Sequence, residues 1–129
     1  MNSEPCKVLV IDDNRDAADS AVMLLRIWGH DGIAAYSAAE ALEIGRRFEP
    51  DVVLIDIGLP GKSGFDVAQD LKRCCPNARF VALTGFTRAD VARRARDEGF
   101  ADHLVKPAEL PVLKHVVEDQ CAAGEHRSN

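Results

Sequence analysis

The sequence VVLIDIGLP at residues 52–60 is the stretch that decides the fold. Its first four residues are apolar and mostly β-branched, which is typical of a strand buried on both faces of a sheet. The run ends in a carboxylate, Asp56, and the loop behind it contains Gly58 and Pro60. Because ligands of open α/β sheets bind outside the carboxyl ends of the strands, this ending marks a candidate functional edge.

A second run of the same kind is KVLVIDD at residues 7–13, which also ends in carboxylates. Weaker runs at residues 33–36, 80–84 and 103–105 complete the set of expected strands. Between the strands, apolar residues recur at spacings of three and four, the period of an amphipathic helix. We expect helices from Arg15 to Gly29, from Ser37 to about Phe48, from Phe65 to Cys74, from Thr87 to Gly99, and from about Leu110 to Cys121.

Strands that alternate with helices in this way predict an α/β domain with a parallel sheet, because parallel strands need crossover connections. The helices then cover both faces of the sheet. The length of 129 residues fits one such domain. We place the domain at residues 6–122, between an N-terminal tail at residues 1–5 and a disordered C-terminal tail at residues 123–129.

Composition excludes several classes of protein. A formal net charge of -5 provides no cationic field for nucleic acid phosphates, so we expect no direct nucleic acid partner. No apolar run approaches the roughly 20 residues that span a bilayer, and the N-terminus lacks a signal-peptide core, so we expect a cytoplasmic protein without membrane insertion. The four cysteines contain no C-x-x-C pair, fit that compartment, and predict no thiolate metal site.

Polar residues follow the buried strands where each strand ends. They are Asp12, Asp13, Asp56, Thr84 and Lys106. Since parallel strands end at the same edge of the sheet, we expect these side chains to share one site. Clustered carboxylates repel one another, and an all-oxygen ligand set selects a hard divalent ion, so we expect Mg²⁺, with Mn²⁺ as a possible substitute.

Such a site is suited to phosphoryl transfer. Asp56 is the candidate nucleophile and would become an acyl phosphate. The metal, Lys106, and the Thr84 hydroxyl with a nearby backbone N–H match the three equatorial oxygens of a phosphoryl group. No residue of the set is an obvious general base for water, so we expect slow hydrolysis of the intermediate.

Four short motifs, read together, resemble the receiver domain of two-component response regulators. They are IDDN at residues 11–14, VLIDIGLP at residues 53–60 with Gly64, LTG at residues 83–85, and VKP at residues 105–107. The resemblance covers roughly residues 6 to 122. It implies a flavodoxin-like, three-layer (βα)5 sandwich with the strand order 2-1-3-4-5.

The resemblance also implies roles for individual residues. Asp56 would accept phosphate from a phosphohistidine of a sensor histidine kinase or a histidine phosphotransfer protein, in a reaction that the domain itself catalyses. The other implied roles are metal binding by Asp12, Asp13, Asp56 and the Gly58 carbonyl, phosphoryl binding by Thr84, Gly85 and Lys106, and a cis Lys106-Pro107 bond. A downstream protein would bind the fourth helix, fifth strand and fifth helix.

The chain departs from the family pattern at two positions. His103 stands three residues before Lys106, where most receivers carry a Tyr or Phe that moves with phosphorylation. We consider both a strand residue, with switching through Thr84 alone, and an imidazole switch that would be pH-dependent. Gly58 replaces a larger side chain and leaves the phosphoryl group more open to water.

Other functions remain open at the level of sequence. A docking module with the same fold that is never phosphorylated is the main alternative. The chain could equally be a receiver segment of a hybrid sensor kinase, which residues 99–107 resemble. A phosphatase of the haloacid dehalogenase type would carry an acidic residue two positions after its nucleophile, where this chain has Gly58.

Overall fold

A single parallel sheet forms the centre of the molecule. The computed structural model describes residues 5–85 and 89–127. Its strands are β1 (Lys7–Ile11), β2 (Asp31–Ala35), β3 (Val52–Asp56), β4 (Arg79–Thr84) and β5 (Asp102–Val105). They pair in the order β2-β1-β3-β4-β5, and every pair is parallel. The α/β class predicted from the sequence pattern and the strand order 2-1-3-4-5 implied by the resemblance are therefore confirmed.

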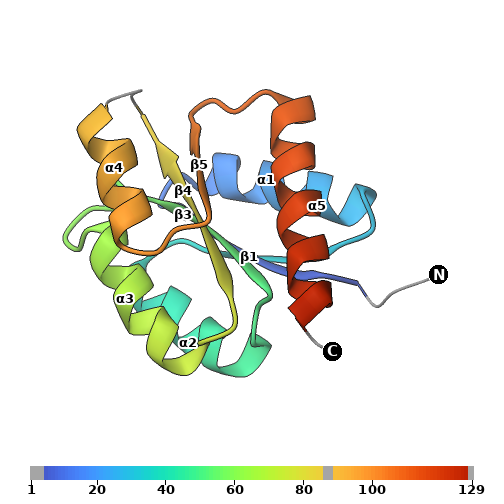
Figure 1. The fold of residues 1–129 in the computed structure, drawn as a ribbon, viewed down its shortest axis with the longest axis horizontal. Coiled ribbons are helices and arrows are strands. Elements are labelled where there is room, and N and C mark those ends of the chain that lie inside the picture. The colour runs from blue at the N-terminus through green and yellow to red at the C-terminus, as the bar shows by residue number, and fades with distance from the viewer. Residues whose placement is uncertain (1–4, 86–88, 128–129) are drawn as a thin grey trace.

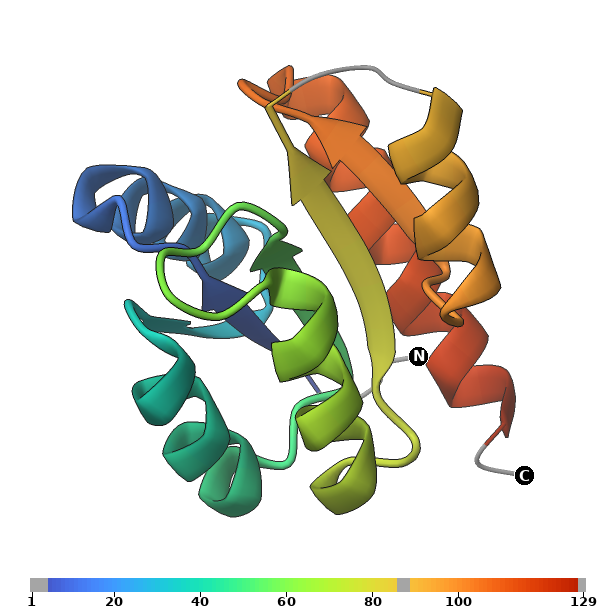
Figure 2. The same cartoon turned by 90° about the vertical axis from the view of Figure 1, so that its left-hand side faces the viewer.

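Helices cover both faces of this sheet and produce three layers (Figures 1 and 2). The side chains of α1 (Arg15–Ile27) and α5 (Leu110–Arg127) pack on one face. Those of α2 (Ala38–Phe48), α3 (Gly64–Cys74) and α4 (Ala89–Asp97) pack on the other. None of the helices in the described part of the chain is both long enough and apolar enough to cross a membrane.

The alternation of side chains along each strand divides the core into two clusters. In β1, Val8 and Val10 contact the helices α1 and α5, whereas Leu9 and Ile11 contact the opposite helices. The four residues after Lys7 are buried for this reason, and the apolar run has no polar alternation. The clusters hold the strand ends in register, which is what brings the polar residues at those ends together.

The boundaries differ from expectation in a few places. β2 begins at Asp31 instead of Ile33 because the Asp31 N–H donates to the carbonyl of Cys6 and starts the pairing with β1 earlier. The helix α5 continues to Arg127, so part of the stretch expected as a disordered tail is helical. The expected helix start at Thr87 lies outside the described residues.

A disulfide joins the two ends of the domain. Cys6, just before β1, is bonded to Cys121 in α5, 115 positions further along the chain, and their Cα atoms are 5.9 Å apart. Cys74 and Cys75 are free thiols. The cysteine spacing predicts free thiols in a reducing compartment and gives no sign of this pair. The pairing depends on where β1 and α5 meet in the folded domain.

Candidate functional site

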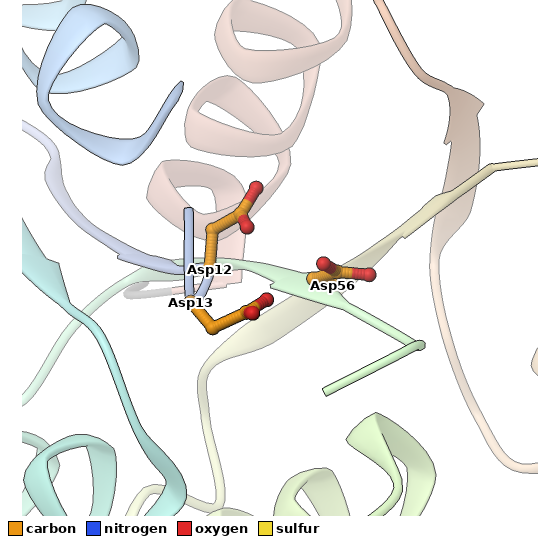
Figure 3. Close-up of side chains that lie close together, drawn as sticks. All are labelled: Asp12, Asp13 and Asp56. Atoms are coloured by element: carbon orange, nitrogen blue, oxygen red, sulfur yellow. The ribbon is translucent and has the colours of Figure 1, made fainter. Parts of the chain in front are cut away.

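Three carboxylates meet at the carboxyl end of the sheet. Asp12 and Asp13 follow β1, and Asp56 is the last residue of β3, which is the neighbour of β1. One oxygen from each lies within 4.8 Å of the others. Figure 3 shows the three side chains emerging from these adjacent strand ends. Asp12 is buried and Asp13 is exposed, so the cluster opens to solvent on one side.

Lys106 supplies the positive charge of the cluster. Its Nζ lies 2.8 Å from Asp12 Oδ2 and 3.4 Å from Asp56 Oδ2. Its backbone N–H donates to the carbonyl of Thr84, which places the residue directly beyond β5. Burial by itself would lower the pKa of Lys106, but the hydrogen bond to Asp12 and the charge of Asp56 outweigh it, so the pKa is raised and the ammonium stays charged.

Backbone N–H groups hold the second carboxylate oxygen of Asp12 and of Asp56. Asp12 Oδ1 accepts from the N–H of Asn14 at 3.0 Å, and Asp56 Oδ1 accepts from the N–H of Gly58 at 2.9 Å. Asn14 is the N-cap of α1 and accepts from the N–H of Ala17. The sequence did not single out Asn14 for a role beyond its motif, although its position before a helix is a recognised capping signal.

The remaining expected site residues fall into two groups. Thr84 is buried at the end of β4, next to Leu83, which pairs with Asp56, and Gly85 follows it at the surface. His103 lies elsewhere: it is half-buried in β5 and borders a hollow of about 200 Å³ under α4. The structure therefore places Thr84 and Gly85 at the edge that carries the carboxylates, and His103 between α4 and β5.

Gly64 lets the loop after Asp56 close tightly. The N–H of Gly64, the first residue of α3, donates to the carbonyl of Ile57 at 3.0 Å. A Cβ on Gly64 would lie 2.4 Å from the carbonyl oxygen of Asp56, which is far inside van der Waals contact. At Gly58 an added Cβ would meet Asp56 Oδ1 at 3.6 Å, an ordinary contact. Only the first of these glycines is required by close approach.

The donor set fits a hard divalent cation. The carboxylates of Asp12, Asp13 and Asp56 together with the Lys106 ammonium leave two negative charges at the site. All the available donors are oxygens, which favours Mg²⁺, Mn²⁺ or Ca²⁺ over zinc. The three carboxylates therefore form a candidate site for a divalent metal ion.

Comparison with known proteins decides the family. Residues 8–118 match the model of the response regulator receiver domain. The chain belongs to this family. The Lys106-Pro107 peptide bond is cis, so this expectation from the resemblance is confirmed.

Individual relatives agree with the assignment. The receiver domain is 32% identical over 117 residues to the transcriptional regulatory protein PdtaR of Mycobacterium tuberculosis, covering 88% of this chain and 56% of that protein. It is 25% identical over 115 residues to sporulation initiation phosphotransferase F of Bacillus subtilis, covering 87% of this chain and 90% of that protein. The chain thus spans about half the length of the first of these relatives.

A solved structure of a response regulator from Burkholderia pseudomallei superposes with a TM-score of 0.81 at 25% identity, covering 95% of this chain and 72% of that one. That structure contains a phosphorylated aspartic acid, a calcium ion and citrate. Membership of the receiver family implies a histidine kinase or a phosphotransfer protein as partner.

Proposed function

We propose that this receiver domain takes a phosphoryl group onto Asp56 from the phosphohistidine of a sensor histidine kinase or a histidine phosphotransfer protein, in a Mg²⁺-dependent step of a phosphorelay, and signals by conformational change. One observation carries the proposal: three carboxylates and the Lys106 ammonium meet at adjacent strand ends. The phosphorylated aspartate in the Burkholderia pseudomallei relative supports it.

The transfer exchanges one phosphorus bond for another. A carboxylate oxygen of Asp56 attacks phosphorus as the P–N bond to the donor imidazole breaks, and the imidazole leaves with the electron pair of that bond. Lys106, already 3.4 Å from Asp56 Oδ2, would bind a phosphoryl oxygen. The Thr84 hydroxyl and the backbone N–H of Gly85 would bind another.

The acidic cluster would hold the ion through the carboxylates of Asp12, Asp13 and Asp56 and the backbone carbonyl of Gly58. We assign Mg²⁺, with Mn²⁺ as the substitute. When bound, the ion supplies positive charge against the carboxylates and the phosphoryl oxygens. Asp12 already uses both oxygens on Asn14 and Lys106, so its carboxylate orientation is preset before an ion arrives.

The domain would catalyse its own phosphorylation and dephosphorylation instead of turning over a separate substrate. None of the assigned site residues is placed as a general base for water, so hydrolysis of the acyl phosphate is slow. Gly58 has no side chain to shield the phosphoryl group, which shortens the lifetime of the adduct relative to a receiver with a larger residue there.

The signal would leave through α4, β5 and α5, with Thr84 and His103 as switch residues. Lys106 connects the site to this surface, because it lies between β5 and α5. The residues that line the hollow beside His103 include Arg96, Phe100 and Asp102. The imidazole therefore has both charged and apolar groups close to it. If the His103→Phe variant binds its partner with the same pH profile as wild type, the imidazole is not part of the switch.

We place the domain in the cytoplasm, together with its phosphodonor.

Phosphorylation by a small donor tests the proposal directly. The protein is incubated with acetyl phosphate and Mg²⁺, and its intact mass is followed over time for wild type, Asp56→Asn and Asp66→Asn. Asp66 is an exposed residue in the first turn of α3 and serves as the matched control. We expect a persistent phosphoryl adduct on wild type and on Asp66→Asn, and none on Asp56→Asn.

The other outcomes identify the alternatives. Absence of an adduct on wild type would favour a docking module that is never phosphorylated. Rapid turnover of varied phosphate esters would favour a phosphatase. An adduct that persists on Asp56→Asn would assign the phosphoacceptor to another residue.

A further inference from the structure

The amino end of the sheet, opposite the acidic cluster, is closed by a covalent bond. Cys6 and Cys121 are 9% and 8% exposed, and both belong to the core cluster shared by α1, α5 and the sheet. The start of β1 and the end of α5 lie side by side in Figures 1 and 2. The bond therefore joins the first strand to the last helix of the domain.

Noncovalent contacts hold the start of β1 whether or not the bond is present. The carbonyl of Cys6 accepts from the N–H of Asp31 at 2.9 Å. The N–H of Lys7 donates to Asp51 Oδ2 at 2.9 Å, and the Lys7 carbonyl accepts from the N–H of Asp51 at 2.7 Å. None of these hydrogen bonds involves the Cys6 sulfur, so reduction does not remove them.

The helix α5 is held in the domain by packing, by a side-chain hydrogen bond and by the disulfide. Leu113, Val116 and Val117 pack in the core, and Gln120 Oε1 accepts from Arg79 Nε at 2.6 Å. Cys121 follows immediately, and Ala122 after it is exposed. Among the described side chains of α5, those that pack in the core extend to Cys121, and the disulfide adds a covalent tether near the C-terminal end of the helix.

We propose that Cys6–Cys121 is a reversible redox-modification site whose oxidation state holds or releases the C-terminal end of α5. The anchors on either side keep the two sulfurs positioned, so the reduced pair can form the bond again. In the compartment proposed above, a disulfide is transient and not permanent. The consequence for signalling rests on the proposed function, because α5 belongs to the proposed output surface and begins just after Lys106.

The exchange chemistry needs a small thiol such as glutathione in one direction and its disulfide in the other. A thiolate attacks one sulfur of the bond and forms a mixed disulfide, and the thiolate of a second molecule then releases the protein. The products are the thiols of Cys6 and Cys121 and one small-molecule disulfide, so two electrons and two protons pass to the protein. Because both cysteines are nearly buried, attack requires opening of the end of α5.

The test compares oxidised and reduced full-length protein. Thiols are counted by alkylation and intact mass in glutathione buffers of different potential, and amide hydrogen exchange is measured along α5. The variants are Cys121→Ser, which cannot form the bond, and Cys74→Ser, which removes an exposed thiol outside it. Adduct formation with acetyl phosphate is measured in both redox states as an independent readout.

We expect reduction to leave the domain folded and to accelerate exchange at residues 121–127 by about tenfold, an opening far below global unfolding. Oxidised Cys74→Ser should behave as wild type, and Cys121→Ser should match the reduced protein. Unchanged exchange at the end of α5, unfolding of the reduced wild type, or absence of the bond under oxidising glutathione would each overturn the proposal. Failure of phosphorylation in both redox states would instead count against the proposed function alone.

Discussion

The two ends of the sheet are stabilised by different kinds of interaction. At the carboxyl end, Asp12, Asp56 and Lys106 form a charged cluster fixed by hydrogen bonds and open to solvent at Asp13. At the amino end, buried apolar side chains and the Cys6–Cys121 bond hold the elements together. The charged cluster and the disulfide are therefore separated by the length of the strands, and we expect that either can be altered without loss of the other.

The largest expected effect on stability comes from the amino end. Replacing Cys121 with Ser removes a cross-link that closes a loop of more than a hundred residues, and we expect the free energy of unfolding to fall by about 3–5 kcal/mol. Urea unfolding of oxidised wild type and of the Cys121→Ser variant measures this change. Mg²⁺ affinity should be the same in both proteins, and a matching loss of Mg²⁺ binding would show that the two ends are not independent.

The next effect belongs to the carboxyl end. Lys106→Ala leaves the buried Asp12 carboxylate without its ammonium, and we expect a loss of about 2 kcal/mol without Mg²⁺ and a smaller loss with it. Because the pKa of Lys106 is raised, its contribution is fully present at neutral pH and is lost only as alkaline pH passes that raised value.

The matched control is Lys114→Ala, which removes an exposed ammonium 3.9 Å from Glu118. We expect its unfolding free energy to change by less than about 0.5 kcal/mol. Equal losses of unfolding free energy in Lys106→Ala and Lys114→Ala would mean that the cluster at the carboxyl end stabilises the fold no more than an exposed ion pair does.

A pair of glycines tests how tightly the loop after Asp56 must close. Gly64→Ala brings a Cβ within 2.4 Å of the Asp56 carbonyl oxygen, so α3 must move, and we expect a loss of about 1–3 kcal/mol. Gly58→Ala meets Asp56 Oδ1 at 3.6 Å and should change the unfolding free energy by no more than about 0.5 kcal/mol. Thermal unfolding of both variants distinguishes the two positions, and a stable Gly64→Ala protein would contradict the close approach.

The last expected effect has the opposite sign. Asp13→Asn removes one of three repelling carboxylates from an exposed position, so without a divalent ion we expect the free energy of unfolding to rise by up to about 1 kcal/mol. Affinity for Mg²⁺, measured by calorimetry, should fall at the same time. A less stable variant would indicate that Asp13 is held by favourable contacts and not by repulsion.

Much of the fold follows from local patterns in the sequence. The apolar, mostly β-branched runs at residues 8–11 and 52–55 predict strands covered on both faces, and a charged residue directly after each run locates the functional edge. For this reason the sequence alone predicts that Asp12, Asp13 and Asp56 share one site. The boundary of β2 was placed less well because its pairing with Cys6 is a nonlocal hydrogen bond.

By itself the sequence determined the layered class, the edge that carries the carboxylates and the residues that meet there, because burial and strand polarity are written into neighbouring positions. Tertiary structure alone decided which carboxylate oxygens Lys106 reaches, why Gly64 has no room for a side chain, and that Cys6 lies beside Cys121. These depend on how elements far apart in the chain pack against one another, and no local pattern of residues encodes such distances.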